Sequence, residues 1–218
     1  LEAARRLGLL VAEEIPFYQA GNGFIHWYLD KRPLKEFPLP LFGLRHLRRR
    51  ALLHATRRHL AEMVERDRNN PAVILWGVAN ESFTLGSRAA TLYGRLREVV
   101  RMFDETRPVT MAEFTHGKPL LDRRRRGGDG VDVVSVNTYY GWYYGRQEEI
   151  GDRLDELHRR YPDRPVILSE FGAGAAPGRS ESDGIFEASR VPPGRTFSEE
   201  YQSHLIEHYL IEALSRPW

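Results

Sequence analysis

Two apolar runs that each end in a glutamate constrain this chain more than any other feature. Residues 73–82 read VILWGVANES, and residues 166–173 read VILSEFGA. Both runs have the length and the β-branched residues of a buried strand. A (β/α) barrel carries its functional groups at the carboxyl ends of its strands. Two acids that face one sugar-sized space are the equipment of a glycosidase, so the sequence predicts Glu81 and Glu170 as a catalytic pair.

Short apolar runs alternate with helical patterns along the chain, which predicts a sheet with helical crossovers. We expect strands near residues 9–12, 72–78, 109–112, 131–136 and 165–169, and helices near 1–7, 44–63, 92–103, 147–161 and 197–214. The strand runs lack polar alternation, which is typical of strands buried on both faces. Residues 17–41 exceed an ordinary connection, and their Trp27 and Tyr28 are expected either to cover a bound aglycone or to anchor the loop.

The first predicted strand argues against an open doubly wound sheet. Such a sheet usually has a glycine-rich phosphate turn after its first strand, whereas here EEIP follows. Several strand ends carry polar groups instead: Glu14, Asn80 with Glu81, Glu113, Asn137 with Tyr139, and Glu170. The prediction is an α/β fold, an incomplete TIM (β/α)8 barrel. A closed barrel needs eight strands and about 250 residues, so we expect residues 1–218 to be a single partial domain whose missing strands lie before Leu1 and after Trp218.

Composition removes several classes of function. The chain has no cysteine, which excludes disulfides, thiolate metal ligands and a cysteine nucleophile. A formal net charge of +2 argues against a nucleic-acid partner, and no run reaches the roughly 20 apolar residues of a membrane span. The histidines lack metal-ligand spacing, so no metal and no cofactor is expected. Arg123 to Arg126 is interpreted as a solvated turn.

Location and assembly are only weakly constrained by the sequence. The first residues lack the apolar core of a signal peptide. We therefore take a cytoplasmic location as the default expectation. The parent protein is compatible with a homo-oligomer.

A retaining mechanism requires the two acids to differ. Glu170 has to be ionised, because its oxygen attacks the anomeric carbon. Its negative charge disfavours ionisation of Glu81, which then donates a proton to the leaving oxygen and later acts as the base that activates water. Asn80, next to Glu81, can donate an amide hydrogen bond to a neighbouring sugar hydroxyl.

Three blocks of residues carry a resemblance to a known family. They are residues 70–81, 131–143 and 167–173, and residues 7–16 and 197–202 match as well. These blocks resemble the catalytic barrel of glycoside hydrolase family 2, and within it the β-glucuronidases, over essentially the whole chain. The first and third blocks are shared across the family and its wider clan. NTYYGWY at residues 137–143 is more specific, and favours glucuronidase over β-galactosidase or β-mannosidase.

The resemblance implies that the chain covers about strands three to seven of the barrel. It implies retaining hydrolysis of a β-glucuronide or related carbohydrate, with Glu81 as acid/base and Glu170 as nucleophile. Asn80 would contact the sugar 2-hydroxyl, and Tyr139 would lie near the nucleophile. The implied substrate-binding residues are Asn80, Asn137, Tyr139, Trp142 and Tyr143. In the family, the sugar carboxylate is read mainly by an Asn-x-Lys element and a tryptophan of the eighth strand, which we expect beyond Trp218.

Other functions stay open at this point. The sugar could be that of another family 2 activity, a β-galactosidase, β-galacturonidase or β-mannosidase. The chain could also be a catalytically inactive fragment that binds sugar or serves only as structure. An unrelated barrel enzyme, such as an aldolase or a metal-dependent hydrolase, is disfavoured because the chain lacks the strand-end lysine or the histidine cluster that those enzymes use.

Overall fold

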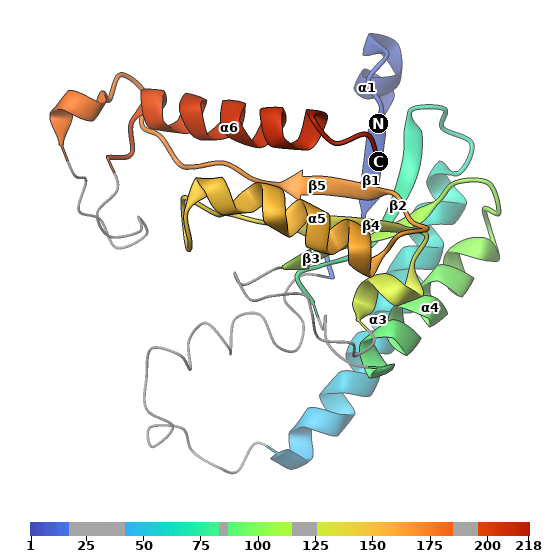
Figure 1. Cartoon of the computed structure of the whole chain (residues 1–218). Coiled ribbons are helices and arrows are strands. Elements are labelled where there is room, and N and C mark those ends of the chain that lie inside the picture. Colours follow the sequence, from blue (N-terminus) through green and yellow to red (C-terminus); the bar gives the residue numbers. More distant parts are fainter. Residues whose placement is uncertain (18–41, 83–86, 115–125, 185–195) are drawn as a thin grey trace. The chain divides into compact units, whose positions relative to one another are not determined.

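The computed structural model of the chain describes residues 1–17, 42–82, 87–114, 126–184 and 196–218 (Figure 1). The predicted roles of Trp27 and Tyr28, and most of the arginine run, lie outside these residues. The chain divides into two compact units. The first unit contains Leu1–Phe114 and Arg124–Ser135, and the second contains Thr115–Arg123 and Val136–Trp218. Each unit is described by itself.

The first unit is built from parallel strands and the helices that follow them. Its elements are α1 (Glu2–Leu7), β1 (Val11–Glu14), α3 (Phe42–Asp67), β2 (Val73–Asn80), α4 (Ser87–Arg101), β3 (Val109–Phe114) and the short 3-10 helix η3 (Gly127–Gly130). β1 pairs with β2 and β2 pairs with β3, both in parallel. Parallel strands bring their carboxyl ends to one edge of a sheet, so the glutamates after these strands share that edge.

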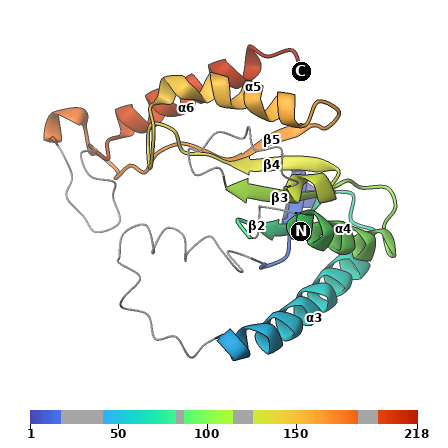
Figure 2. The ribbon, with the colours of Figure 1, turned by 60° about the horizontal axis from the view of Figure 1, so that its bottom comes forward.

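The second unit continues the alternation. β4 (Val133–Asn137) passes from the first unit into the second. η4 (Gln147–Glu149), α5 (Ile150–Arg160), β5 (Val166–Glu170), η5 (Glu181–Asp183) and α6 (Glu199–Leu214) follow. α5 and α6 lie side by side (Figure 2). The sheet order is β1-β2-β3-β4-β5, which is the order of the sequence. The predicted fold class, an incomplete α/β barrel, is confirmed.

The prediction that every strand is buried on both faces is wrong for the two edge strands. β2, β3 and β4 are buried along nearly their whole length, whereas side chains of β1 and β5 alternate between half-buried and exposed. The first strand also begins at Val11 and not at Leu9. Gly8 closes α1 in the left-handed conformation, and the Leu9 backbone N–H still donates to Ala4 O, so Leu9 belongs to the helix end.

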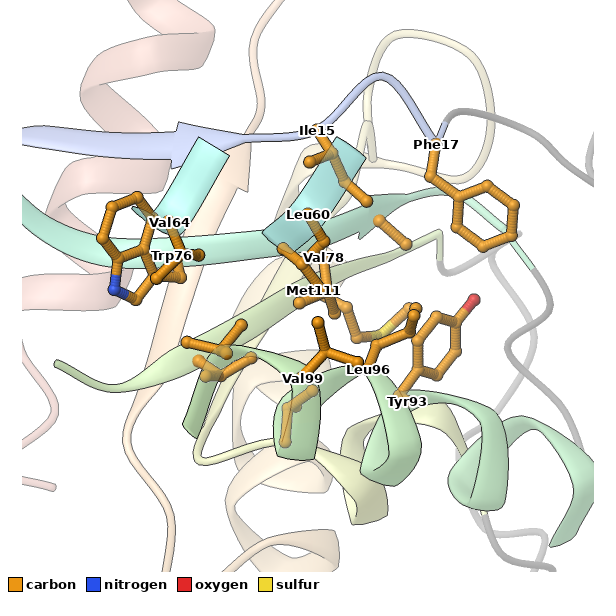
Figure 3. Packing of buried hydrophobic residues seen from close by; sticks show 14 of the residues in the cluster. Ile15, Phe17, Leu60, Val64, Trp76, Val78, Tyr93, Leu96, Val99 and Met111 are labelled. Atoms are coloured by element: carbon orange, nitrogen blue, oxygen red, sulfur yellow. The ribbon is translucent and has the colours of Figure 1, made fainter. Parts of the chain in front are cut away.

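The core of the first unit lies between β2, β3 and the two long helices. Trp76 and Val78 are two residues apart on β2, so they point to the same face, where α3 and α4 cover them (Figure 3). Leu96 and Val99 of α4 are buried there, as the helical spacing predicts. The apolar stripe of α4 therefore fixes this helix against the strand that ends at Glu81.

A buried polar cluster fixes the beginning of β2. Trp76 Nε1 donates to Asp104 Oδ2 at 2.9 Å, and the Arg107 side chain donates to the backbone carbonyl of Val73 at 2.6 Å. Burial alone would raise the pKa of Asp104. Hydrogen bonds from Thr106, Arg107 and Trp76 outweigh it and hold the pKa well below its usual value. Asp104 is therefore an ionised anchor for the strand.

Two glycines near α4 should respond oppositely to alanine. A Cβ on Gly130 would lie 2.7 Å from Gly94 N and would also clash with Ala90 O, so Gly130→Ala should lower the free energy of unfolding by about 1–3 kcal/mol. A Cβ on Gly94 would meet nothing within 4 Å. Gly94→Ala, inside a helix, should therefore raise stability by about 0.5–1 kcal/mol. Urea denaturation of the two variants checks this, and a Gly130→Ala variant as stable as the unaltered protein would contradict the packing of η3 on α4.

Candidate active site

The backbone turns sharply where β2 ends. Glu81 has φ 48°, in the left-handed region that residues with a Cβ rarely adopt. Two backbone hydrogen bonds hold this turn: Glu81 N–H donates to Ala112 O of β3 at 2.9 Å, and Asn80 N–H donates to Phe17 O at 3.0 Å. Asn80 and Glu81 are both half-buried. The turn thus presents their side chains at the carboxyl edge of the sheet.

Ser82 ties the same turn to the rest of the first unit. Its hydroxyl donates to Phe17 O at 3.0 Å and to Asn80 O at 3.1 Å. Its carbonyl accepts a hydrogen bond from the hydroxyl of Tyr93, a fully buried residue of α4. Neighbouring elements therefore hold the peptides on both sides of Glu81.

The strand end at Glu113 corrects the prediction of a solvated arginine turn at Arg126, the residue of that run that the structure describes. Glu113 is 0% exposed, and its carboxylate accepts from Arg126 Nε at 3.0 Å and from Gly128 N at 2.7 Å. Arg126 is itself buried, so the last arginine of the run faces inward. The reason is charge pairing: a carboxylate that is fully removed from water needs a cation and hydrogen-bond donors. Glu113 thereby holds η3 and is structural.

In the second unit, Glu170 ends β5 next to a tyrosine. The Tyr139 hydroxyl donates to Glu170 Oε2 at 2.5 Å. Thr138 N–H donates to Glu170 O at 2.9 Å, which fixes the backbone at the same point. Both the main chain and the side chain of Glu170 are therefore positioned by residues that directly follow β4.

Asn137 contacts the residue that precedes Glu170 in β5. The Ser169 hydroxyl donates to Asn137 Oδ1 at 2.7 Å, and Asn137 is fully buried. The amide oxygen of Asn137 is thus engaged with the residue before Glu170. Its predicted contact with the sugar stays a prediction, since the described contact is with protein.

Aromatic rings surround a hollow of about 200 Å³ beside this strand end. Trp142 is buried and stacks on Phe197, with ring centroids 6.0 Å apart. Tyr143 is 57% exposed, and its ring meets Tyr139 edge-on at 5.0 Å. The hollow is lined by Tyr139, Trp142, Tyr143, Phe171, Gly172, Ala173, Gly174 and Phe197. Flat rings arranged in this way suit the apolar faces of a sugar or an aglycone.

Two backbone features set the shape of the hollow. Gly172 has φ 114°, which explains a glycine directly after Glu170-Phe171. Phe197 has φ 57° although it carries a side chain, and a Cβ on Gly174 would collide with its ring. Gln202 of α6 donates to Ala173 O at 2.7 Å. The start of α6 therefore holds the Ala173 backbone, which lines the hollow.

The structure divides the predicted site residues between the two units. Asn80 and Glu81 lie in the first unit, and Asn137, Tyr139, Trp142, Tyr143 and Glu170 lie in the second. The structure joins Tyr139 to Glu170 and Tyr143, and it joins Asn137 to the neighbour of Glu170. Sequence reasoning missed Phe197 as a lining residue. Its place in a matching block, residues 197–202, was the available signal.

The described ranges show neither a metal site nor a membrane-spanning helix. Among those residues, no three His, Cys, Asp or Glu side chains gather so that they could hold a metal ion. No helix of that part of the chain is both long and apolar enough to cross a membrane. The described strand ends carry carboxylates, amides and phenol hydroxyls.

Comparison with protein families gives one match over most of the chain. The family described as "Glycosyl hydrolases family 2, TIM barrel domain" matches residues 48–216. This range includes every predicted site residue, from Asn80 to Glu170.

Curated relatives are similar over parts of their length. A β-glucuronidase of Mus musculus is 38% identical over 155 residues, which are 69% of this chain and 22% of that protein. A β-glucuronidase of Streptococcus agalactiae is 32% identical over 214 residues, 95% of this chain and 32% of that protein. The chain thus spans about a third or less of the length of these relatives.

Solved structures share the fold. A β-glucuronidase from Ruminococcus gnavus in complex with D-glucaro-d-lactam superposes with a TM-score of 0.74 at 23% identity, covering 99% of this chain and 32% of that chain. The β-glucuronidase of Bacteroides uniformis superposes with a TM-score of 0.67 at 27% identity, covering 99% and 23%. These likenesses agree with the strand order and the incomplete barrel.

Replacement of Arg126 measures how much the buried ion pair of Arg126 and Glu113 contributes to the free energy of unfolding. Arg126→Met leaves the Glu113 carboxylate buried without its cation, and should lower the free energy of unfolding by about 3–5 kcal/mol. Glu113→Gln in the same protein should restore part of that loss, because the uncompensated charge is gone. Urea denaturation of the single and double variants measures both effects.

Arg146→Met is the matched control, because Arg146 and Glu148 are exposed and 3.9 Å apart. It should change stability by less than about 0.5 kcal/mol. Equal losses for Arg126→Met and Arg146→Met would contradict the description of Glu113 as a buried, paired carboxylate.

Proposed function

The chain belongs to glycosyl hydrolase family 2, and from this premise we propose that its parent protein is a retaining β-glycosidase that hydrolyses β-glucuronides. The observation that carries the proposal is the hydrogen bond from Tyr139 to Glu170 beside an aromatic hollow. The names of the relatives in mouse and Streptococcus agalactiae support glucuronic acid as the sugar. NTYYGWY at residues 137–143 supports the same choice.

Glu170 acts as the nucleophile. A carboxylate attacks well only if it is ionised and held in line with the anomeric carbon. The Tyr139 hydroxyl donates to Oε2 at 2.5 Å, and a hydrogen bond of this kind orients the carboxylate. The Glu170 oxygen forms a bond to the anomeric carbon while the glycosidic carbon–oxygen bond breaks, which gives a glycosyl ester.

Glu81 acts as the acid and then as the base. In the first step it gives its proton to the departing glycosidic oxygen, so that the aglycone leaves as a neutral alcohol. In the second step the Glu81 carboxylate takes a proton from water, the water oxygen bonds to the anomeric carbon, and the ester bond to Glu170 breaks. Two inversions give net retention. Retention requires the two carboxyl groups to lie about 5–5.5 Å apart in the complete enzyme.

The neighbours of the two acids hold the sugar. Asn80 adjoins Glu81, and its amide can donate to the sugar 2-hydroxyl, a contact that strengthens in the transition state. Tyr139, Trp142 and Tyr143 supply flat surfaces around the hollow, with Tyr143 the most exposed of them. Asn137 supports the site through Ser169, and we assign it to the sugar site as well.

Replacement of the nucleophile tests the proposal directly. Glu170→Gln in the full-length protein keeps the shape of the side chain and removes the attacking charge. It should lower kcat on an aryl β-glucuronide by several orders of magnitude, because the covalent route is lost. The measurement is release of the phenol, with the folding of the variant checked by thermal unfolding.

Glu148→Gln is the matched control, because Glu148 is an exposed glutamate of the same unit. It should leave kcat unchanged. A Glu170→Gln enzyme that turns over at a rate near that of the unaltered protein would refute Glu170 as the nucleophile. A wild-type protein that hydrolyses an aryl β-galactoside or β-mannoside faster than the glucuronide would refute the choice of sugar.

Tyr139→Phe tests the contact to the nucleophile. Loss of one hydrogen bond to a charged group corresponds to about 1.5–3 kcal/mol, so kcat/KM should fall by about tenfold to a hundredfold. Tyr209→Phe removes a buried hydroxyl of the same unit that contacts Tyr140 O, and should lower stability without this kinetic effect. Equal kcat/KM values for Tyr139→Phe and Tyr209→Phe would contradict a role for Tyr139 at Glu170.

A further inference from the structure

The turn that carries Glu81 is held from outside its own strand. Its left-handed φ of 48° is unfavourable for a residue with a Cβ, so the conformation persists only where surrounding contacts determine it. β3 and the segment after β1 supply backbone carbonyls for Glu81 and Asn80. From α4, the Tyr93 hydroxyl donates to Ser82 O.

The Tyr93 ring is closely packed. The residue is fully buried, and Leu96 and Met111 lie beside it in the core (Figure 3). Gly127 also lies against the ring: an added Cβ there would come within 2.9 Å of the ring and within 3.1 Å of the Met111 sulfur. The glycine thus leaves the space that the ring fills, and in this position the hydroxyl reaches Ser82 O.

The short helix η3 carries Gly127, the glycine that lies against the Tyr93 ring. The residues on both sides of Gly127 are held by the Glu113 carboxylate, which is 0% exposed and accepts from Arg126 Nε and Gly128 N. Burial, and next the charge of Glu113, raises the pKa of Tyr93 well above its usual value. The phenol therefore stays protonated and continues to donate at any pH at which an enzyme of this kind works.

We infer that Tyr93 is a positioning residue for the acid/base glutamate: through Ser82 it holds the turn that aims Glu81. The inference rests on the proposed function, in which Glu81 protonates the leaving group. Tyr93 touches neither substrate nor reacting atoms. Its effect on the rate passes through the geometry of the turn alone.

Substrates whose leaving groups differ in acidity distinguish this positioning role from a general loss of structure. A general acid accelerates departure of a poor leaving group strongly and of a very acidic phenol little, because the latter leaves without a proton. A misaimed Glu81 should therefore slow the two substrate types unequally. The parameter kcat/KM reports the first step, in which the aglycone leaves.

The test compares Tyr93→Phe with the unaltered full-length enzyme on phenyl and dinitrophenyl β-glucuronides. We expect kcat/KM for the phenyl substrate to fall by about tenfold to a hundredfold, the effect of a small misplacement of a catalytic group. For the dinitrophenyl substrate it should change by less than about threefold. Val99→Ala, a core truncation in the same helix away from the turn, should slow both substrates equally or not at all.

A Glu81→Ala variant, measured on the same two substrates, distinguishes failure of the positioning role of Tyr93 from failure of the proposed function. If Glu81→Ala shows the unequal loss and Tyr93→Phe does not, the positioning role is overturned while the proposed function stands. If Glu81→Ala itself slows both substrates equally, Glu81 is not the acid and the proposed function fails.

Gly127→Ala gives a second, independent variant. It keeps the Tyr93 hydroxyl and displaces the ring on which that hydroxyl sits. It should reproduce the unequal loss, and it decides the matter if Tyr93→Phe does not fold. Equal kcat/KM losses on both substrates in Gly127→Ala would count against the inference.

Discussion

Parallel pairing of strands decides where this chain can carry chemistry. Because β1, β2 and β3 run in one direction, the groups that follow them meet at one edge of the first unit. In the second unit the bond from Thr138 N–H to Glu170 O joins the ends of β4 and β5 in the same way. Buried strands supply rigid backbones, and the polar residues just beyond them supply function. The position of each glutamate therefore follows from the pairing.

Both glutamates depend on residues that are distant in sequence. Glu81 sits in a left-handed turn held by Ala112 and, through Ser82, by Tyr93. Glu170 is held by Tyr139, 31 residues before it. Strained or sharply oriented backbone is common where function requires it, and the surrounding structure has to compensate. Much of the polar burial in the first unit, including Glu113 with Arg126, supports such positions and takes no part in chemistry itself.

The sequence predicted the elements that local pattern encodes. Apolar runs located β2 to β5 closely, and the helix expected near residues 1–7 is α1, which Gly8 closes in the left-handed conformation. The glutamates were found because they end those runs. The pairing of Arg126 with Glu113, the stacking of Phe197 on Trp142 and the contact of Tyr93 with Ser82 were not predicted. Each joins residues more than ten positions apart, and no short spacing reports such a contact.

The central claim is that Glu170 forms a covalent bond to the sugar during turnover. A suitable reagent is a β-glucuronosyl fluoride in which a second fluorine replaces the sugar 2-hydroxyl. Loss of that hydroxyl slows both formation and breakdown of the ester. Because the fluoride at the anomeric carbon leaves easily, formation of the ester is slowed less than its breakdown. Peptide mass spectrometry of the full-length protein treated with this reagent would locate the bond. The account predicts one sugar per protein, attached to Glu170. A sugar attached to another residue, or an active enzyme that is never labelled, would contradict it.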